Sequence, residues 1–285
     1  MSINDQMIYD RYNIEHVPLV KFNLNPESFH TIDFNGKKLN TYIDGPENGQ
    51  KLFFIHGFDM FVEMYSTFIN ELILTYRVLS VDLPGHGQTD AFDDYQVSIF
   101  QDSIITTLDH YDFKDFTLVG HSMGGMLSII CTGDTNFTKF NISSTIAFCP
   151  AGIKMTESFF GPKKSLCCAS PSPSPDQRRG LFPSDFDSIL SKLKQSKQNP
   201  KYIERRQLMI SDFPWEKSQK QFIQAKDKKV LVFLADDEQY VNTKRTLKFV
   251  QQKCKKWSAK VEKGLHELPI LRPKWAAEQI NGFVK

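Results

Sequence analysis

One stretch, residues 116–125, limits what this chain can fold into more than any other. It is an apolar run rich in strand-forming residues, which ends in Gly-x-Ser-x-Gly around Ser122 and continues with apolar residues at helical spacing. A strand, a tight turn and a helix in this order form the local context of a nucleophile elbow. Such a turn strains the backbone of the serine and tolerates only neighbours without a Cβ, which Gly120 and Gly124 provide. We therefore expect the Ser122 hydroxyl to stand clear of the sheet edge, beside a helix N-terminus.

Segments with strand character alternate with segments of helical spacing on both sides of this stretch. Asn35-Gly36 separates two strand-like runs and predicts a hairpin, because a type I′ turn needs positive φ at both positions. This alternation is typical of βαβ units and predicts an α/β fold: a central, mostly parallel sheet with helices on both faces. Further strands are predicted at 51–55, 77–81, 116–120, 144–148, 230–234 and 259–261, and helices at 65–72, 97–111, 123–130, 243–254 and around 275–280.

The alternation breaks at a polar and basic segment between the predicted strands at 144–148 and 230–234. Residues 150–229 hold 16 Lys and Arg against 8 Asp and Glu, although the net charge of the whole chain is only +2. Apolar residues at helical spacing over 186–193 predict an amphipathic helix there. The predicted division is an N-terminal arm at 1–28, an α/β core at 29–152 and 229–285, and a helical lid (cap) insert at 153–228.

Length, charge and cysteine usage narrow the class of protein. A chain of 285 residues is long enough to bury a full α/β core as one domain, and a net charge of +2 does not favour nucleic acid as a partner. Five cysteines without framework spacing favour a reducing compartment over a disulfide scaffold. The sequence shows neither a secretion signal nor an apolar run long enough to span a bilayer. We therefore expect a cytoplasmic protein.

The chemistry of a serine nucleophile requires two further groups. A serine hydroxyl reacts poorly at neutral pH unless a base takes its proton, and that base must be oriented by a carboxylate. In elbow-type folds the acid and then the histidine follow the serine in the chain. Asp237 and Glu238 come directly after the predicted strand at 230–234, and His266 lies in the loop after the last short strand. The sequence thus supplies both groups in the required order.

Four landmarks together resemble the α/β-hydrolase fold superfamily over about residues 29–285. The resemblance implies that Ser122 is the nucleophile and His266 the base. It also implies an oxyanion hole made by the backbone N–H groups of Phe58 and Met123, and a reaction that needs neither a metal nor an organic cofactor. The landmarks are His56-Gly57-Phe58, residues 82–87 (Asp-Leu-Pro-Gly-His-Gly), residues 120–124 (Gly-His-Ser-Met-Gly) and His266.

The identity of the acid is less determined than that of the serine and the histidine. The superfamily usually has Gly-x-x-Asp after this strand, and here Ala235 takes the place of the glycine and Glu238 that of the acid. A glutamate can serve as well as an aspartate in such triads. A shift of one residue would select Asp237 instead. We favour Glu238 and keep Asp237 as the alternative acid.

The sequence leaves three hypotheses about function. Residues 234–242 and 264–268 resemble lysophospholipase and monoacylglycerol lipase types, which implies hydrolysis of single-chain lipid esters through an acyl-enzyme. A basic insert with an amphipathic helix suits transient contact with an anionic membrane surface, although a solvated basic face has the same composition. The alternatives are a small-molecule carboxylesterase, peptidase or carbon–carbon hydrolase of the same fold, and a catalytically silent binding protein.

Overall fold

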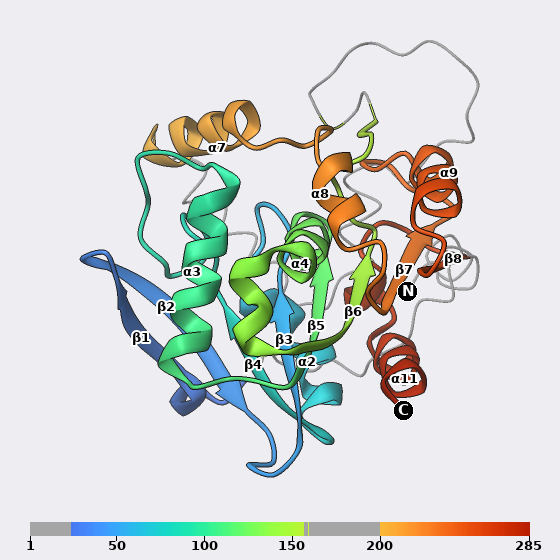
Figure 1. Ribbon diagram of the computed structural model, residues 1–285. Helices are drawn as coiled ribbons and strands as arrows, with labels where there is room; N and C mark the ends of the chain where they lie inside the picture. Colours follow the sequence, from blue (N-terminus) through green and yellow to red (C-terminus); the bar gives the residue numbers. More distant parts are fainter. Residues whose placement is uncertain (1–23, 157–158, 160–199) are drawn as a thin grey trace, which may run out of the picture.

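One eight-stranded sheet forms the centre of the protein. The structure is a computed structural model that describes residues 24–156, 159 and 200–285 (Figure 1). The strands lie in the order β1-β2-β4-β3-β5-β6-β7-β8. The β1–β2 and β2–β4 pairs are antiparallel, and all the later neighbours are parallel. The strands are β1 (Phe29–Phe34), β2 (Lys37–Asp44), β3 (Gln50–Ile55), β4 (Tyr76–Val81), β5 (Phe116–His121), β6 (Ile142–Phe148), β7 (Val230–Ala235) and β8 (Ser258–Glu262).

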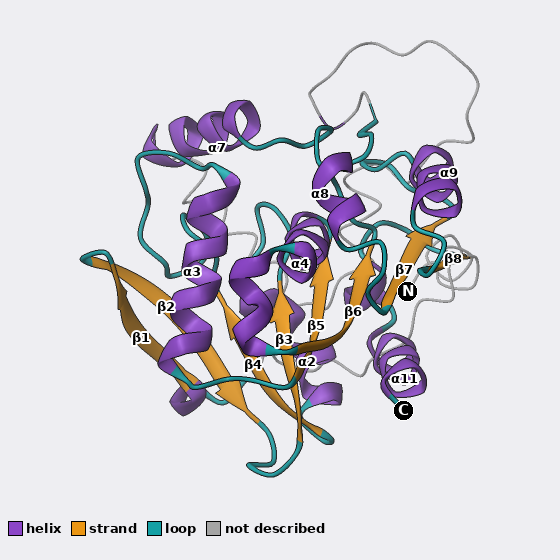
Figure 2. Ribbon diagram, in the orientation of Figure 1, coloured by secondary structure: helices purple, strands orange, loops and turns teal. Residues whose placement is uncertain are grey.

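Helices cover both faces of this sheet (Figure 2). On one face, Ile104 and Leu108 of α3 join a core cluster with residues of α4, α8 and α9. On the other, Phe68 and Leu72 of α2 pack in a second cluster with Ile280 of α11. The α/β fold predicted from the alternation of segments is therefore confirmed. The helices are η1 (Pro26–Ser28), η2 (Val62–Tyr65), α2 (Ser66–Leu72), α3 (Val97–His110), α4 (Met123–Gly133), η3 (Thr135–Phe140), α7 (Pro200–Asp212), α8 (Gln219–Gln224), α9 (Thr243–Lys253), α10 (Leu268–Leu271) and α11 (Pro273–Val284).

Local sequence signals locate the strands well. Every predicted strand is observed with bounds within two residues of the prediction. The hairpin between β1 and β2 turns at Asn35 and Gly36, whose φ angles are 56° and 76°, as a type I′ turn requires. The short helices η3, α8 and α10 were not predicted, because one or two turns carry too little hydrophobic periodicity to be recognised.

The segment between β6 and β7 contributes α7 and α8, and α7 lies beyond the carboxyl ends of the parallel strands (Figure 1). It is anchored by Met209, Phe213 and Trp215, whose side chains are buried in the core. The amphipathic helix predicted at 186–193 lies outside the described residues, as does the predicted arm up to residue 23.

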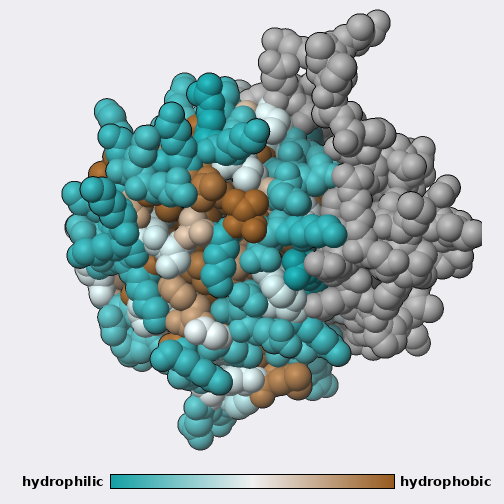
Figure 3. Space-filling view, turned by 90° about the vertical axis from the view of Figure 1, so that its right-hand side faces the viewer, coloured by the Kyte–Doolittle hydropathy of each residue, from teal (hydrophilic) through white to brown (hydrophobic). Residues whose placement is uncertain are grey.

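One face of the described part is mainly hydrophilic. The coloured part of the view in Figure 3 is mostly hydrophilic, and hydrophobic residues form separate patches on it. Among the described residues, the large hydrophobic side chains that stand exposed are Leu74, Ile223 and Val261. No helix in the described ranges combines the length and the hydropathy needed to cross a membrane.

Candidate active site

Ser122 lies in the tight turn between β5 and α4. Its φ is 56° and its ψ is −114°, in a region that residues with a side chain seldom adopt. A Cβ on Gly120 would lie 2.2 Å from the carbonyl oxygen of Gly124, and a Cβ on Gly124 would lie 2.2 Å from that of Ile55. Both glycines are therefore required by close backbone approach, and the strained elbow predicted from the motif is present.

The two residues expected to supply the oxyanion hole follow Ser122 and Gly57 in the chain. Met123 is the first residue of α4, where a backbone N–H has no acceptor within the helix. Phe58 follows Gly57, and a Cβ on Gly57 would lie 3.3 Å from the Cβ of Ser122. The loop after β3 thus packs directly against the serine.

His266 and Glu238 are joined by a hydrogen bond. The Nδ1 atom of His266 lies 2.7 Å from Oε2 of Glu238, and the two side chains are only 7% and 2% exposed. The other oxygen of Glu238, Oε1, accepts the backbone N–H groups of Tyr240 at 2.8 Å and Val241 at 3.3 Å. Of the two carboxylates that the sequence left open, Glu238 and not Asp237 is the one seen bonded to the imidazole.

Glu238 keeps its charge although it is buried. Burial by itself raises the pKa of a carboxyl group, since it disfavours the ionised form. The neighbouring His266 charge and hydrogen bond, together with the N–H groups of Tyr240 and Val241, outweigh burial and hold the pKa of Glu238 below its usual value. The carboxylate is therefore available to orient the imidazole and to stabilise its protonated form.

His121 and Tyr65 connect the three loops of the site. The Nε2 atom of His121 lies 2.9 Å from the backbone oxygen of His266, and its Nδ1 lies 2.6 Å from the Tyr65 hydroxyl. That hydroxyl also accepts the N–H of Gly57 at 3.1 Å. Burial lowers the pKa of His121 well below its usual value, so the ring is neutral: Nε2 donates to the carbonyl and Nδ1 accepts from Tyr65.

This connection was only partly predictable. His121 belongs to the Gly-x-Ser-x-Gly motif, and its burial and its bond to the main chain make it a packing residue and not a base. Nothing in the sequence distinguishes Tyr65 from any other buried tyrosine on a helical face. Its role depends on the meeting of two loops that lie far apart in the chain.

An aromatic cluster borders the loop after β3. The Phe58 ring lies 5.0 Å from the ring of Trp215, which in turn lies 4.7 Å from that of Phe159. Arg206 of α7 lies over the Phe58 ring at 5.4 Å, and its Nε is 2.7 Å from Oδ2 of Asp59. The segment between β6 and β7 therefore contacts Phe58 through an aromatic and a cationic group, and Asp59 through an ion pair.

Cys149 completes a buried group of three side chains. Its sulfur, a Glu238 oxygen and a His266 nitrogen all lie within 4.8 Å of one another. These are ligand types that zinc accepts, but zinc binds cysteine as a thiolate. Burial, followed by the charge of Glu238, raises the pKa of the Cys149 thiol well above its usual value. With no metal ion bound, the thiol is therefore neutral.

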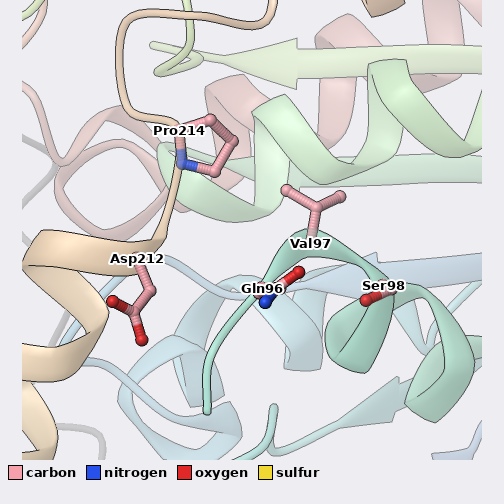
Figure 4. Close-up of a pocket in the computed structure, with 5 residues that line it drawn as sticks. All are labelled: Gln96, Val97, Ser98, Asp212 and Pro214. Atoms are coloured by element: carbon pink, nitrogen blue, oxygen red, sulfur yellow. The ribbon is translucent and has the colours of Figure 1, made fainter.

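A separate depression lies between the start of α3 and the end of α7 (Figure 4). Its volume is about 450 Å³, and its lining contains none of the predicted catalytic residues. It is lined by Gln96, Val97, Ser98, Asp212 and Pro214.

Comparison with known proteins agrees with this geometry. The sequence profile of the alpha/beta hydrolase family matches residues 52–262, well over half of the chain. The chain belongs to this family. Its eight-stranded, mostly parallel sheet with helices on both faces is the alpha/beta hydrolase fold that the four landmarks imply.

The curated relatives include proteins named as a hydrolase, a lactonase and a synthase. The (E)-2-((N-methylformamido)methylene)succinate hydrolase of Acinetobacter baylyi is 35% identical over 104 residues, which are 36% of this alpha/beta hydrolase and 38% of the relative. The matched segments span 25 to 38% of the length of such curated relatives.

Two solved structures illustrate the likeness in fold. A bacterial membrane phospholipase A superposes with a TM-score of 0.70 at 17% identity, covering 90% of this chain and 85% of its own. A meta-cleavage product hydrolase of Pseudomonas fluorescens has a TM-score of 0.70 at 20% identity, covering 91% and 98%. Identities this low show the fold and leave the substrate undetermined.

Proposed function

We propose that this alpha/beta hydrolase is a serine hydrolase that cleaves carboxylic esters through a Ser122–His266–Glu238 triad. The observation that carries the proposal is the 2.7 Å hydrogen bond between His266 Nδ1 and Glu238 Oε2, on loops at the same edge of the sheet as the strained serine. Because Nδ1 is engaged by the carboxylate, Nε2 is the ring atom that serves as the base. The second carboxylate, Asp237, then has no part in the triad.

The reaction takes two steps. The Ser122 hydroxyl attacks the ester carbonyl while His266 takes its proton, and Glu238 stabilises the imidazolium that forms. The N–H groups of Phe58 and Met123 stabilise the oxyanion, and the loss of one such donor typically lowers kcat by about 10²–10³. The protonated imidazole then gives its proton to the leaving alcohol oxygen as the ester bond breaks. Water, deprotonated by the same base, attacks the acyl-enzyme and frees the acid.

We propose a single-chain lipid ester, such as a lysophospholipid or a monoacylglycerol, as the substrate. The aromatic cluster of Phe58, Phe159 and Trp215 offers an apolar wall next to the oxyanion loop for an acyl chain. The segment between β6 and β7 serves as a lid, and its excess of basic residues favours transient contact with an anionic lipid surface. The similarity in fold to a membrane phospholipase A is compatible with this choice.

A small-molecule ester is the second candidate. It is favoured by sequence relatives that are named for a succinate derivative and an enol-lactone, the succinate derivative hydrolase and 3-oxoadipate enol-lactonase 1 of Acinetobacter baylyi. The two candidates differ in the length of acyl chain that the site has to hold.

Activity-based labelling followed by an ester panel tests the proposal. We expect a fluorophosphonate probe to label the wild-type protein and to leave Ser122→Ala unlabelled at equal folding, as judged by circular dichroism. Activity on p-nitrophenyl esters should rise with acyl length, whereas activity confined to the shortest chains favours the small-molecule candidate. Absence of labelling in folded wild-type protein contradicts catalysis and favours a binding role.

A further inference from the structure

Cys149 occupies a strained position at the end of β6. It follows the last residue of that strand, its side chain is fully buried, and its φ is +46°. A cysteine at positive φ is uncommon, and such strain persists only where surrounding contacts enforce it. Its backbone N–H donates to the oxygen of Phe233 on β7 at 2.7 Å. The chain therefore leaves the sheet at Cys149 while this residue stays anchored to β7.

The strain directs the thiol toward the acid of the proposed triad. The sulfur lies within 4.8 Å of both a Glu238 oxygen and a His266 nitrogen. A neutral thiol carries one hydrogen and an ionised carboxylate can only accept, so a bond between the two has the S–H as its donor. Burial and the charge of Glu238 raise the pKa of the thiol well above its usual value, so it remains a neutral donor.

The donor count around Glu238 shows what the thiol contributes. An ionised carboxylate has about four lone-pair positions, and a buried one is costly to leave incompletely bonded. Oε1 accepts the N–H groups of Tyr240 and Val241, and Oε2 is bonded to His266 Nδ1. These three bonds leave one lone-pair position, and the Cys149 sulfur lies within 4.8 Å of the carboxylate.

We propose that Cys149 is a positioning residue for the triad: its S–H donates to Glu238 and holds the carboxylate where it meets His266. This inference rests on the proposed serine hydrolase function. A bonded carboxylate is a weaker base, so the thiol also moderates how strongly Glu238 stabilises the protonated imidazole. Without the thiol, the imidazole should hold its proton to a higher pH.

Cys149→Ala and Cys149→Ser separate this role from packing, with Cys254→Ala as the control for removing another fully buried thiol. We expect Cys149→Ala to lower kcat by about 3- to 10-fold with little change in KM, and to move the acid limb of the pH–rate profile upward by about half a pH unit. Cys149→Ser keeps a donor, so its kcat and its pH–rate profile should stay close to those of the wild type. Cys254→Ala should leave the profile unchanged.

A titration of the His266 ring by NMR reads the same contact without turnover. A higher titration midpoint in Cys149→Ala than in wild type or Cys149→Ser supports the proposal. An unchanged midpoint and profile in folded Cys149→Ala overturns it, and so does a serine variant that behaves like the alanine variant. If wild-type protein neither labels nor hydrolyses esters, the proposed function fails while this titration still tests the thiol contact.

Discussion

The elbow that carries Ser122 and the loops that carry Glu238 and His266 meet at the same edge of the sheet, but different interactions hold them. The elbow is held by backbone sterics: a serine at φ 56° between two glycines whose Cβ positions would overlap carbonyl groups. The loops are held by side-chain hydrogen bonds, from His266 to Glu238 and from His121 to the His266 carbonyl.

This contrast has consequences for tolerance to substitution. A steric requirement is met or violated outright, so the elbow should accept almost no change in its glycines. A hydrogen-bonded arrangement weakens by degrees, so conservative changes around Glu238 should alter rate and pH dependence while the protein stays folded. Four predictions test this difference.

The largest effect is expected in the elbow. Gly124→Ala places a Cβ 2.2 Å from the Ile55 carbonyl oxygen, which neither backbone can avoid, and should lower the free energy of unfolding by about 4 kcal/mol or more. Gly282→Ala in α11 is the matched control, because a Cβ there meets nothing within 4 Å. It should stabilise the protein by about 0.5–1 kcal/mol. Urea denaturation measures both, and equal stability of the two variants would refute the steric account.

In the loops, replacing the acid should lower the rate strongly while the protein still folds. Glu238→Gln removes the charge that orients and stabilises the imidazole, and should lower kcat by about 10³–10⁴. Asp237→Asn should change kcat by less than about threefold. Steady-state kinetics with an ester that the wild type cleaves measures both. A large loss confined to Asp237→Asn would transfer the acid role to that residue.

The stability of the loops should also depend on pH. Glu238 has a pKa below its usual value in the folded protein, so its ionised form contributes stability above the unfolded value of about 4.3, and this contribution is lost as the pH falls through the lower folded value. The difference in unfolding free energy between wild type and Glu238→Gln should therefore shrink on going from pH 7 to pH 3. A difference that is constant with pH contradicts a depressed pKa.

The smallest effect is expected where α7 meets the loop after β3. The Arg206–Asp59 ion pair is partly exposed, with side chains 41% and 24% accessible, so Arg206→Ala should cost less than about 1 kcal/mol of stability. Lys154→Ala, which breaks a pair with Glu216 of similar exposure, is the control. Because Arg206 lies over Phe58 and breaking the Lys154 pair leaves that contact intact, only the removal of Arg206 should lower kcat, by a few fold. Equal kcat in the two variants would contradict an influence of α7 on the loop after β3.

Much of the fold was predictable because its signals are local. The Asn35-Gly36 turn, the strands and the helices α2, α3, α4, α9 and α11 follow from residues that are neighbours in the chain, whereas α7 was not predicted. The order of strands in the sheet, with β3 between β4 and β5, came from no such signal. It depends on which apolar faces pack together once the helices are in place.

The sequence by itself determined the elbow, the order of serine, acid and histidine, and the alternating pattern that makes a mostly parallel sheet. These are properties of adjacent residues, where steric limits and side-chain periodicity act directly. Only the tertiary structure decided that Glu238 and not Asp237 reaches His266, that Cys149 lies beside this pair, and that Tyr65 bonds to His121. Each depends on hydrogen bonds between loops far apart in the chain, and a shift of one residue in a loop redirects a side chain without altering the local pattern.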